Sequence, residues 1–265
     1  MSGSERSDHQ GAAIWLEREG PVATLTLSDP ARRNAFGAAT YAQMRQACDE
    51  VDEDQSIGAL VVRGDDGHFC SGADRALLAD VGRDPVETEN YAVLSSIYAA
   101  VARVGQLTVP VVAAVRGAAL GAGLNLALAA DVRVVAEDCR LMSGFAPIGM
   151  HPGGGHFNLL TRATSRETAA ALAFFADPIS GHDAVRLGLA WECVPDDRVE
   201  PRAHELARVV AADPDLARAM KRSLQSTWAS TWDVALDAER SAQMWTLSRK
   251  HGPARAYQDG EVVHE

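Results

Sequence analysis

Two glycine-rich segments of this chain have the composition of sites that hold a carbonyl oxygen or an anion. HFCSGAD spans residues 68–74, GAALGAGLNL spans residues 117–126, and each follows an apolar run typical of a buried strand. Glycine lets the backbone approach a ligand closely, and the first N–H groups of a helix have no partner within that helix. Two such N–H groups converging on one oxygen would polarise a carbonyl. Composition is equally consistent with glycines that only permit tight packing of a helix on a strand.

Three polar side chains near these segments could move protons. Asp74 closes the first segment, and His151 and His156 lie in GMHPGGGHF, residues 149–157. Imidazole is the usual proton carrier at neutral pH. Each side chain also has a structural interpretation: the aspartate as the cap of the next helix, the histidines as partners of the glycine turn. Neither histidine has a cysteine or carboxylate at metal-ligand spacing, so no metal site is expected.

The elements that must position these residues alternate between strands and helices. Apolar or alternating runs predict strands at 13–19, 22–29, 59–64, 111–117, 131–137 and 140–142. Helical periodicity and capping signals predict helices at about 38–54, 86–104, 122–130, 153–162, 165–176, 181–188, 196–212, 214–228 and 232–250, with Ser165 as one N-cap. The first two strands read as a hairpin, and the later alternation predicts an α/β fold on a largely parallel sheet.

Composition limits the class of protein. The chain has 265 residues, 47% of them hydrophobic, and a net charge of −11, which disfavours a nucleic-acid or anionic-membrane partner. Four scattered cysteines without a CxxC pair indicate reduced thiols. The first residues lack the apolar core of a signal peptide, and no apolar stretch is long enough to cross a bilayer. We therefore expect a cytoplasmic protein, with residues 1–12 as a flexible tail.

The order of four segments resembles that of the crotonase superfamily, also called the enoyl-CoA hydratase/isomerase family. These are ARRNAF, HFCSGAD, VVAAVRGAALGAGLNLALAADVRV and GMHPGGGHFNLL. The resemblance implies a crotonase-like spiral of ββα units over residues 13–200 and a helical C-terminal oligomerisation region over 201–265. It also implies a homotrimer or dimer of trimers that binds an acyl-CoA thioester. Coenzyme A would then be part of the substrate, with no separate cofactor.

Matched motif to motif, the resemblance assigns residues to the thioester carbonyl. Ser71 and Ala122 would donate the two backbone N–H groups of an oxyanion hole, and backbone donors do not depend on the identity of the side chain. Ala73 and Gly121, in the same two turns, would contact the substrate.

The same matching assigns ARRNAF to the nucleotide end of coenzyme A. Arg32 and Arg33 would lie near its phosphates, and the backbone of Ala35 near its adenine. For the two arginines, ordinary solvated charge is the alternative interpretation.

Two positions depart from the family's pattern. Hydratases of this family use two glutamates to position and activate water, and the matching places Asn125 and Phe145 there. An amide has no usable pKa and cannot act as a general base. Asn125 and Phe145 are therefore expected to bind substrate, with Asp74 or His151 as the replacement proton carrier.

These residues favour an enzyme that acts on an acyl-CoA, a lyase or isomerase of fatty acid metabolism in which ordinary hydration is not expected. Two alternatives stay open. One is a non-catalytic acyl-CoA-binding protein. The other is a C–C bond hydrolase for a diketone, with His151 or His156 as its base.

Overall fold

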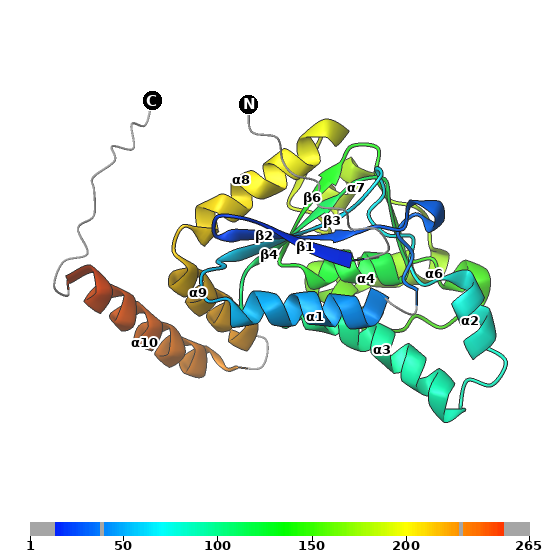
Figure 1. Cartoon of the computed structure of the whole chain (residues 1–265), viewed down its shortest axis with the longest axis horizontal. Helices are drawn as coiled ribbons and strands as arrows, with labels where there is room; N and C mark the ends of the chain where they lie inside the picture. The colour runs from blue at the N-terminus through cyan, green and yellow to red at the C-terminus, as the bar shows by residue number, and fades with distance from the viewer. Residues whose placement is uncertain (1–13, 38–39, 228–229, 252–265) are drawn as a thin grey trace. The chain divides into compact units, whose positions relative to one another are not determined.

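The computed structural model describes residues 14–37, 40–227 and 230–251 (Figure 1). The chain divides into two compact units, of which the first ends at Ala217 and the second begins at Arg218. The tail expected over residues 1–12 lies outside the described residues.

A six-stranded sheet forms the centre of the first unit. Its strands, in spatial order, are β1 (Ile14–Glu19), β2 (Val22–Leu27), β3 (Ala59–Gly64), β4 (Val111–Val115), β6 (Val132–Ala136) and β8 (Glu192–Val194). The strands β1 and β2 form the predicted antiparallel hairpin, and every other neighbouring pair is parallel. A second, two-stranded parallel sheet pairs β5 (Ala118–Leu120) with β7 (Arg140–Met142).

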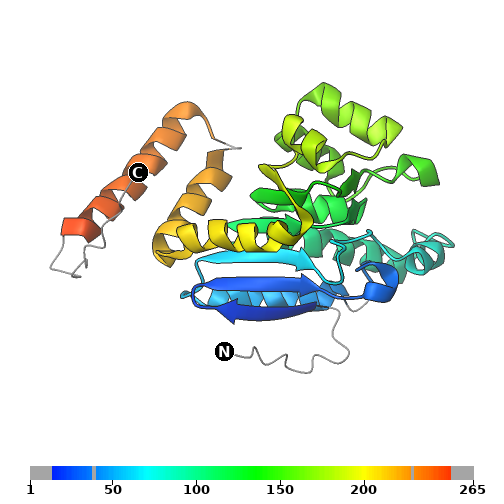
Figure 2. The ribbon, with the colours of Figure 1, turned by 90° about the horizontal axis from the view of Figure 1, so that it is seen from above.

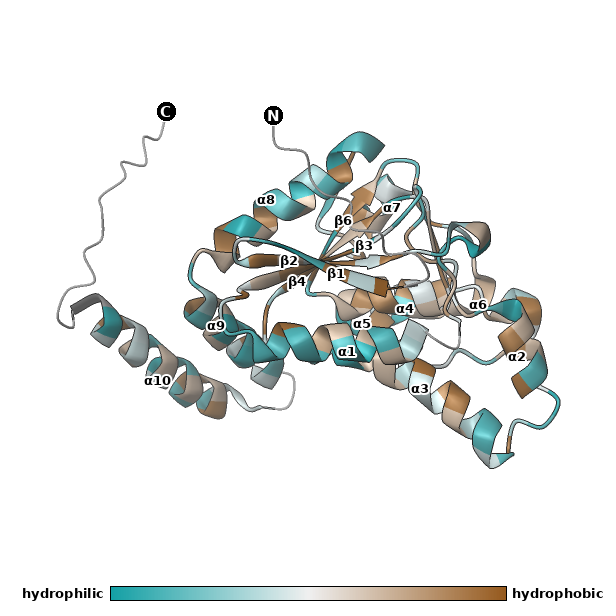
Figure 3. Ribbon diagram, viewed as in Figure 1, coloured by the Kyte–Doolittle hydropathy of each residue, from teal (hydrophilic) through white to brown (hydrophobic). Residues whose placement is uncertain are grey.

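The central strands are buried along nearly their whole length and are mostly apolar, because helices cover both faces of the sheet. Every residue of β2 and of β4 is buried, and Figure 3 shows the middle of the sheet in brown. Strands buried on both faces read as continuous apolar runs rather than alternating ones. This is why VVAAV was recognisable as a strand.

Eight helices belong to the first unit as the structure describes it. They are α1 (Thr40–Glu53), α2 (Arg75–Val81), α3 (Thr88–Gly105), α4 (Ala122–Ala129), α5 (His156–Ala163), α6 (Arg166–Phe175), α7 (Gly181–Arg186) and α8 (Val199–Ala211). Short 3-10 turns lie at Pro30–Arg32, Ala146–Ile148 and Asp196–Arg198. Helix α9 (Pro214–Thr227) crosses the boundary between the units, and α10 (Trp232–His251) lies in the second. Ser165 caps α6 as predicted, accepting a hydrogen bond from the N–H of Thr168 at 3.1 Å.

Two boundaries differ from the sequence prediction for local reasons. The predicted strand 111–117 ends at Val115, because the chain turns at Gly117 with φ +53°, and the short strand β5, which was not predicted, follows the turn. A Cβ at Gly117 would collide with the carbonyl oxygen of Gly67, so only glycine fits this turn. Capping of a following helix was one interpretation of Asp74, but no bounds were predicted for α2, because its seven residues carry too little periodicity.

Helix α8 lies along one face of the sheet (Figures 1 and 2). Its buried stripe consists of Val199, Ala203, Ala207 and Ala211, each fully buried. The helix approaches so closely that a Cβ at Gly58 would lie 2.7 Å from the Cα of Ala211. The first unit therefore includes α8 and runs past the expected boundary at residue 200.

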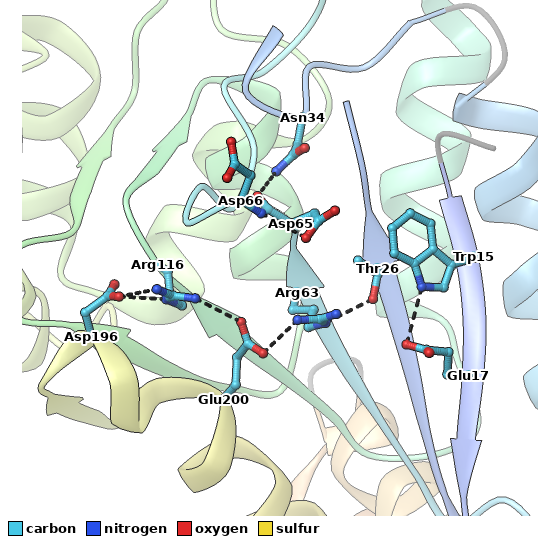
Figure 4. Close-up of polar contacts among 10 residues, drawn as sticks. All are labelled: Trp15, Glu17, Thr26, Asn34, Arg63, Asp65, Asp66, Arg116, Asp196 and Glu200. Carbon is cyan, nitrogen blue, oxygen red and sulfur yellow. Dashed lines mark hydrogen bonds and ion pairs between the residues drawn. The ribbon is translucent and has the colours of Figure 1, made fainter. Parts of the chain in front are cut away.

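A row of polar contacts joins the start of α8 to strands β2 and β3 and to the residue that follows β4 (Figure 4). Glu200 pairs with Arg63 at 2.7 Å and with Arg116 at 3.4 Å, and Arg116 also pairs with Asp196. Arg63 continues the row by donating to the hydroxyl of Thr26 at 3.1 Å. These half-buried charges are all partnered, and they hold α8 in register with the sheet.

Candidate active site

The two glycine-rich segments lie side by side. The N–H of Cys70 donates to the Ala118 oxygen at 2.9 Å, and the N–H of Leu120 donates to the Cys70 oxygen at 3.0 Å. A Cβ at Gly123 would collide with that same Cys70 oxygen. Glycine is thus required for the start of α4 to reach the first segment, so the packing and ligand-binding interpretations of these glycines do not exclude each other.

Two backbone N–H groups that donate to no acceptor in the described residues lie where the two segments meet. Among the residues that the structure describes, no acceptor takes a hydrogen bond from the N–H of Ala73 or of Ala122. Gly72 joins the two turns: with φ +96°, its Cβ position lies 3.6 Å from the Ala122 nitrogen. Ala122 is the first residue of α4, where the helix supplies no acceptor. Two free donors on adjacent turns form a candidate oxyanion hole.

The prediction that the N–H of Ser71 is free to bind a substrate oxygen is wrong. Its N–H donates to the Arg33 oxygen at 3.0 Å, and its hydroxyl donates to the Arg32 oxygen at 2.8 Å. Ser71 therefore fastens the ARRNAF turn and has no N–H left for a substrate oxygen. The free donor is Ala73, which directly follows the positive-φ glycine; that glycine is the signal that could have placed it correctly.

Asn34 organises the ARRNAF turn, and the sequence analysis missed it. It is buried, with φ +58°. Its side-chain oxygen accepts from the N–H of Asp29 at 2.8 Å, and its NH₂ donates to the oxygens of Asp65 and His68 at 2.8 and 2.6 Å. Figure 4 shows Asn34 directed at Asp65. This buried amide fixes the loop that carries the two predicted phosphate-binding arginines.

Those arginines differ in their surroundings. Arg32 is exposed but pairs with Asp29 at 2.6 Å and with Asp74 at 3.2 Å, and the hydrogen bond to Asp29 raises its pKa. Arg33 is exposed beside it with φ +52°. Ala35 is buried, and its N–H donates to the Arg32 oxygen at 3.3 Å, so that N–H is not free for an adenine. A phosphate would find much of the Arg32 charge already neutralised, whereas Arg33 stands apart from those two carboxylates.

Asp74 is a helix cap rather than a proton carrier. One carboxylate oxygen accepts from the N–H groups of Ala76 and Leu77 at 2.8 and 3.0 Å, at the start of α2. The other oxygen pairs with Arg32. The backbone hydrogen bond from Leu77, with that from Ala76 and the charge of Arg32, lowers the pKa of Asp74. Both carboxylate oxygens are thus engaged by protein groups, which supports the structural interpretation of Asp74 as a helix cap over the expected role as a proton carrier.

Asn125 lies in a buried chain of hydrogen bonds. Its NH₂ donates to the Gly153 oxygen at 2.9 Å, and its side-chain oxygen lies 2.7 Å from Nδ1 of His156. The His156 Nε2 lies 2.8 Å from the hydroxyl of Ser143. Asn125, His156 and Ser143 are 2%, 1% and 1% exposed. The residue matched to the first family glutamate is thus bonded to protein groups through both its side-chain nitrogen and its side-chain oxygen.

The donor and acceptor in each of these hydrogen bonds can be assigned by starting from the Gly153 carbonyl. The Gly153 carbonyl can only accept, so the Asn125 NH₂ faces it and the Asn125 oxygen faces His156. Nδ1 of His156 must then carry the proton, which leaves Nε2 to accept from the Ser143 hydroxyl. Burial lowers the pKa of His156 to about 4, so the imidazole is neutral near pH 7.

Phe145 completes the same cluster. Its ring meets the His156 imidazole edge-on, with the ring centroids 5.0 Å apart, and it lies 3.8 Å from the Cβ position of Gly121. His156 therefore touches the residues at both positions that the motif matching assigns to glutamates. His156, which was not among the residues expected to replace the family glutamates, lies at the centre of this cluster.

Comparison with known proteins fits this geometry. The family model described as enoyl-CoA hydratase/isomerase matches residues 17–258. The chain belongs to the enoyl-CoA hydratase/isomerase family. A probable enoyl-CoA hydratase, EchA14 of Mycobacterium tuberculosis, is 40% identical over 88% of this chain and 89% of its own length. The 1,2-epoxyphenylacetyl-CoA isomerase of Escherichia coli is 32% identical over 90% of both chains.

Solved structures support the same assignment. An enoyl-CoA hydratase from Polaromonas sp. JS666 superposes with a TM-score of 0.84 at 28% identity, over 91% of this chain and 94% of that one. A putative enoyl-CoA hydratase from Thermobifida fusca, solved in complex with CoA, gives 0.79 at 25% identity over 91% and 95%. The crotonase fold predicted from the motifs is confirmed.

Within this family member, His151 lies apart from the buried cluster. It is exposed, its Nδ1 lies 2.7 Å from the Pro152 oxygen, and its ring centroid lies 6.1 Å from that of Phe157. No other hydrogen bond to this ring is formed within the described part of the chain. Its Nε2 therefore has no protein partner there, in contrast to both nitrogens of His156.

The glycine loop next to His151 is held against Tyr98, another residue that sequence reasoning missed. A Cβ at Gly153 would collide with the Tyr98 hydroxyl, and a Cβ at Gly154 would lie 3.1 Å from the Asn125 NH₂. The run of glycines thus lets this loop lie directly over Asn125.

Two further expectations concern metals and membranes. The described residues hold no group of three or more His, Cys, Asp or Glu side chains placed to bind a metal ion. None of the helices found in them is both long and apolar enough for a membrane span.

Cys70, beside the oxyanion turn, is fully buried, and burial raises the pKa of its thiol to about 12, which leaves it protonated.

Proposed function

We propose that this family member binds an acyl-CoA thioester, polarises its carbonyl through the N–H groups of Ala73 and Ala122, and moves a proton at the adjacent carbon. The observation that carries the proposal is the pair of unpartnered donors on adjacent turns. An oxyanion hole stabilises the negative charge that forms on the thioester oxygen when the α-proton leaves. The Thermobifida fusca relative, solved with CoA and with acetoacetyl-CoA, supports the ligand class.

His151 is the proposed proton carrier. It follows the 3-10 turn that begins beside Phe145, and its Nε2 is the free imidazole nitrogen on the loop over Asn125. In the proposed step the Cα–H bond breaks, the proton moves to Nε2, and the electron pair is delocalised onto the thioester oxygen. Return of the proton to Cα gives exchange, and its delivery to Cγ shifts a double bond. Neither outcome consumes water or an oxidant.

Water addition is not part of this proposal. The residues at positions 125 and 145 are an amide and a phenyl ring, and Asp74 is committed to α2. A positioned general base contributes on the order of 10²–10⁴-fold to such a reaction. Hydration should therefore be slow even where the thioester is bound well.

A panel of 2-enoyl-CoA and 3-enoyl-CoA thioesters tests the proposal. We expect double-bond migration, or exchange of the α-protons in D₂O followed by NMR, without formation of 3-hydroxyacyl-CoA. His151→Ala should lower the exchange rate by at least about tenfold at unchanged acyl-CoA affinity. His182→Ala, an exposed histidine on α7, is the matched control and should exchange at the wild-type rate. Equal exchange in both variants would remove His151 from the mechanism.

A second candidate is a non-catalytic acyl-CoA-binding protein. The neutral Asn125–His156–Ser143 chain favours it, because this chain puts no ionised group among these residues near pH 7. Tight binding across the panel without exchange or migration would establish this alternative. Absence of CoA binding would instead favour a diketone hydrolase, for which His151 is the better base because both nitrogens of His156 are occupied.

Binding at the nucleotide end and assembly are also proposals. Arg33, with Arg32 in a lesser role, would bind the phosphates of coenzyme A. The C-terminal helices would join copies into a homotrimer or a dimer of trimers, which analytical ultracentrifugation would distinguish.

A further inference from the structure

His156 is enclosed on every side that the structure describes. It is the first residue of α5, and the imidazole lies between the Asn125 amide and the Ser143 hydroxyl at 2.7 and 2.8 Å. The rings of Phe145 and Phe157 meet it at centroid distances of 5.0 and 6.2 Å. Only 1% of the residue is exposed.

This placement engages the polar groups of the cluster that could otherwise bind a reacting water. A buried water molecule requires at least two hydrogen-bond partners. Within this cluster the Asn125 oxygen and the Ser143 hydroxyl are both bonded to His156, and the Asn125 NH₂ is bonded to the Gly153 oxygen. The remaining neighbour, Phe145, offers a water no hydrogen-bond acceptor.

The direction of the hydrogen bonds makes the arrangement self-consistent. With the Gly153 carbonyl at one end, each hydrogen bond in the chain pairs one donor with one acceptor, and no group needs to ionise. Replacing Asn125 alone by an acid would leave the new carboxylate facing a histidine N–H rather than a water.

We propose that His156 is a specificity-determining residue that excludes water from the acyl end of the site, so that bound acyl-CoA thioesters react by proton transfer at carbon and not by addition of water. This inference rests on the proposed function for the reaction that remains. It adds that the missing acid at position 125 is not the sole barrier to hydration: the imidazole beside it is a second barrier.

A four-protein comparison tests this directly: wild type, Asn125→Glu, His156→Ala, and the two changes together. Each is assayed for formation of 3-hydroxybutyryl-CoA from crotonyl-CoA. We expect hydration only in the double variant, at least about tenfold above Asn125→Glu, because a general base and a space for water are needed together. If Asn125→Glu alone hydrates as fast as the double variant, His156 does not exclude water.

A conservative variant tests whether water is excluded by a side chain that fills the space at position 156 or by the imidazole itself. Glutamine at position 156 can bond to both residue 125 and Ser143, so Asn125→Glu with His156→Gln should hydrate no faster than Asn125→Glu. His182→Ala added to Asn125→Glu is the control for histidine loss elsewhere, and it should also leave the rate unchanged. Hydration by the glutamine variant at the rate of the alanine variant would overturn the proposal.

A measurement on the wild-type protein covers the case in which a variant does not fold. In ¹⁵N-histidine NMR spectra, His156 should be the Nδ1–H tautomer, with a ring N–H that exchanges slowly with water. An Nε2–H tautomer, or rapid exchange of that proton, would overturn the proposal. Exchange of acyl α-protons by the same wild-type sample tests the proposed function separately, so the two failures are distinguishable.

Discussion

The oxyanion hole can be tested at a single atom, because Ala122 occupies the first position of helix α4. Proline is well tolerated at a first helical position, where the missing N–H would have no partner within the helix. The preceding residue, Gly121, has no Cβ to collide with the proline ring. Ala122→Pro therefore removes the proposed donor without breaking a hydrogen bond that the described residues make.

The size of the expected effect follows from the number of donors. The structure offers two, Ala73 and Ala122, and the substitution leaves one. Loss of one donor of an oxyanion hole costs roughly 10²–10³-fold in turnover, or about 2.7–4 kcal/mol. The proline ring also enters the space where the oxygen would lie, so affinity for the thioester should fall. Affinity for free coenzyme A, which has no thioester carbonyl, should not change.

The assay is exchange of the acyl α-protons in D₂O, together with calorimetric titration of acyl-CoA and of free coenzyme A. Arg166→Pro, at the first position of α6, is the matched control, because it places proline at an exposed helix start that follows an extended residue, Ser165. Exchange by Ala122→Pro within threefold of Arg166→Pro would refute the assignment of the carbonyl to this turn. Loss of coenzyme A binding alongside exchange would show a wider structural effect.

Three further outcomes follow from the contacts. Asp74→Ala should lower the free energy of unfolding by about 1 kcal/mol through loss of the α2 cap, with turnover within about threefold of wild type; a hundredfold loss of turnover at unchanged stability would restore a catalytic role. Arg33→Ala should weaken binding of free coenzyme A more than Arg32→Ala does, because Arg32 already pairs with two carboxylates; calorimetry showing the reverse order would contradict this. For His156, the folded pKa of about 4 lies below the unfolded value of 6.5, so the unfolded state binds more protons between these values and stability falls as the pH drops from 6.5 toward 4. The loss is at most about 3 kcal/mol, and denaturant titrations at pH 7 and pH 5 should show a smaller drop in His156→Gln than in wild type.

Most of the predicted elements depended on patterns that act over short distances. The hairpin of β1 and β2, the buried strands β3 and β4 and the capped helix α6 follow from apolar runs, turn residues and a serine cap. The elements that were missed, α2, β5 and β8, have three to seven residues each. Elements this short carry too little periodicity and owe their form to the chain around them.

The sequence predicted where backbone segments of the site come close together, but not which backbone N–H groups remain free. The glycines at positions 72, 117 and 123 are needed where backbone segments approach each other closely, so the glycine-rich sequence correctly indicated a close backbone approach there. Which N–H remains free depends on a bond between residues far apart in the chain, from Ser71 to Arg33. Motif matching does not contain that information, and it assigned the donor to Ser71, whose N–H is bonded, two positions before Ala73.

The sequence by itself determined the family, the crotonase fold and the presence of an amide and a phenyl ring at positions 125 and 145, because these depend on residue identity and order. Only the tertiary structure decided what the polar side chains do. Asp74 became a cap because α2 begins beside it, and His156 became the centre of a buried cluster because α5 places its imidazole between Asn125 and Ser143. The physical reason is that a side chain's proton affinity and availability are set by its burial and by its partners, and those are brought together only when the chain folds.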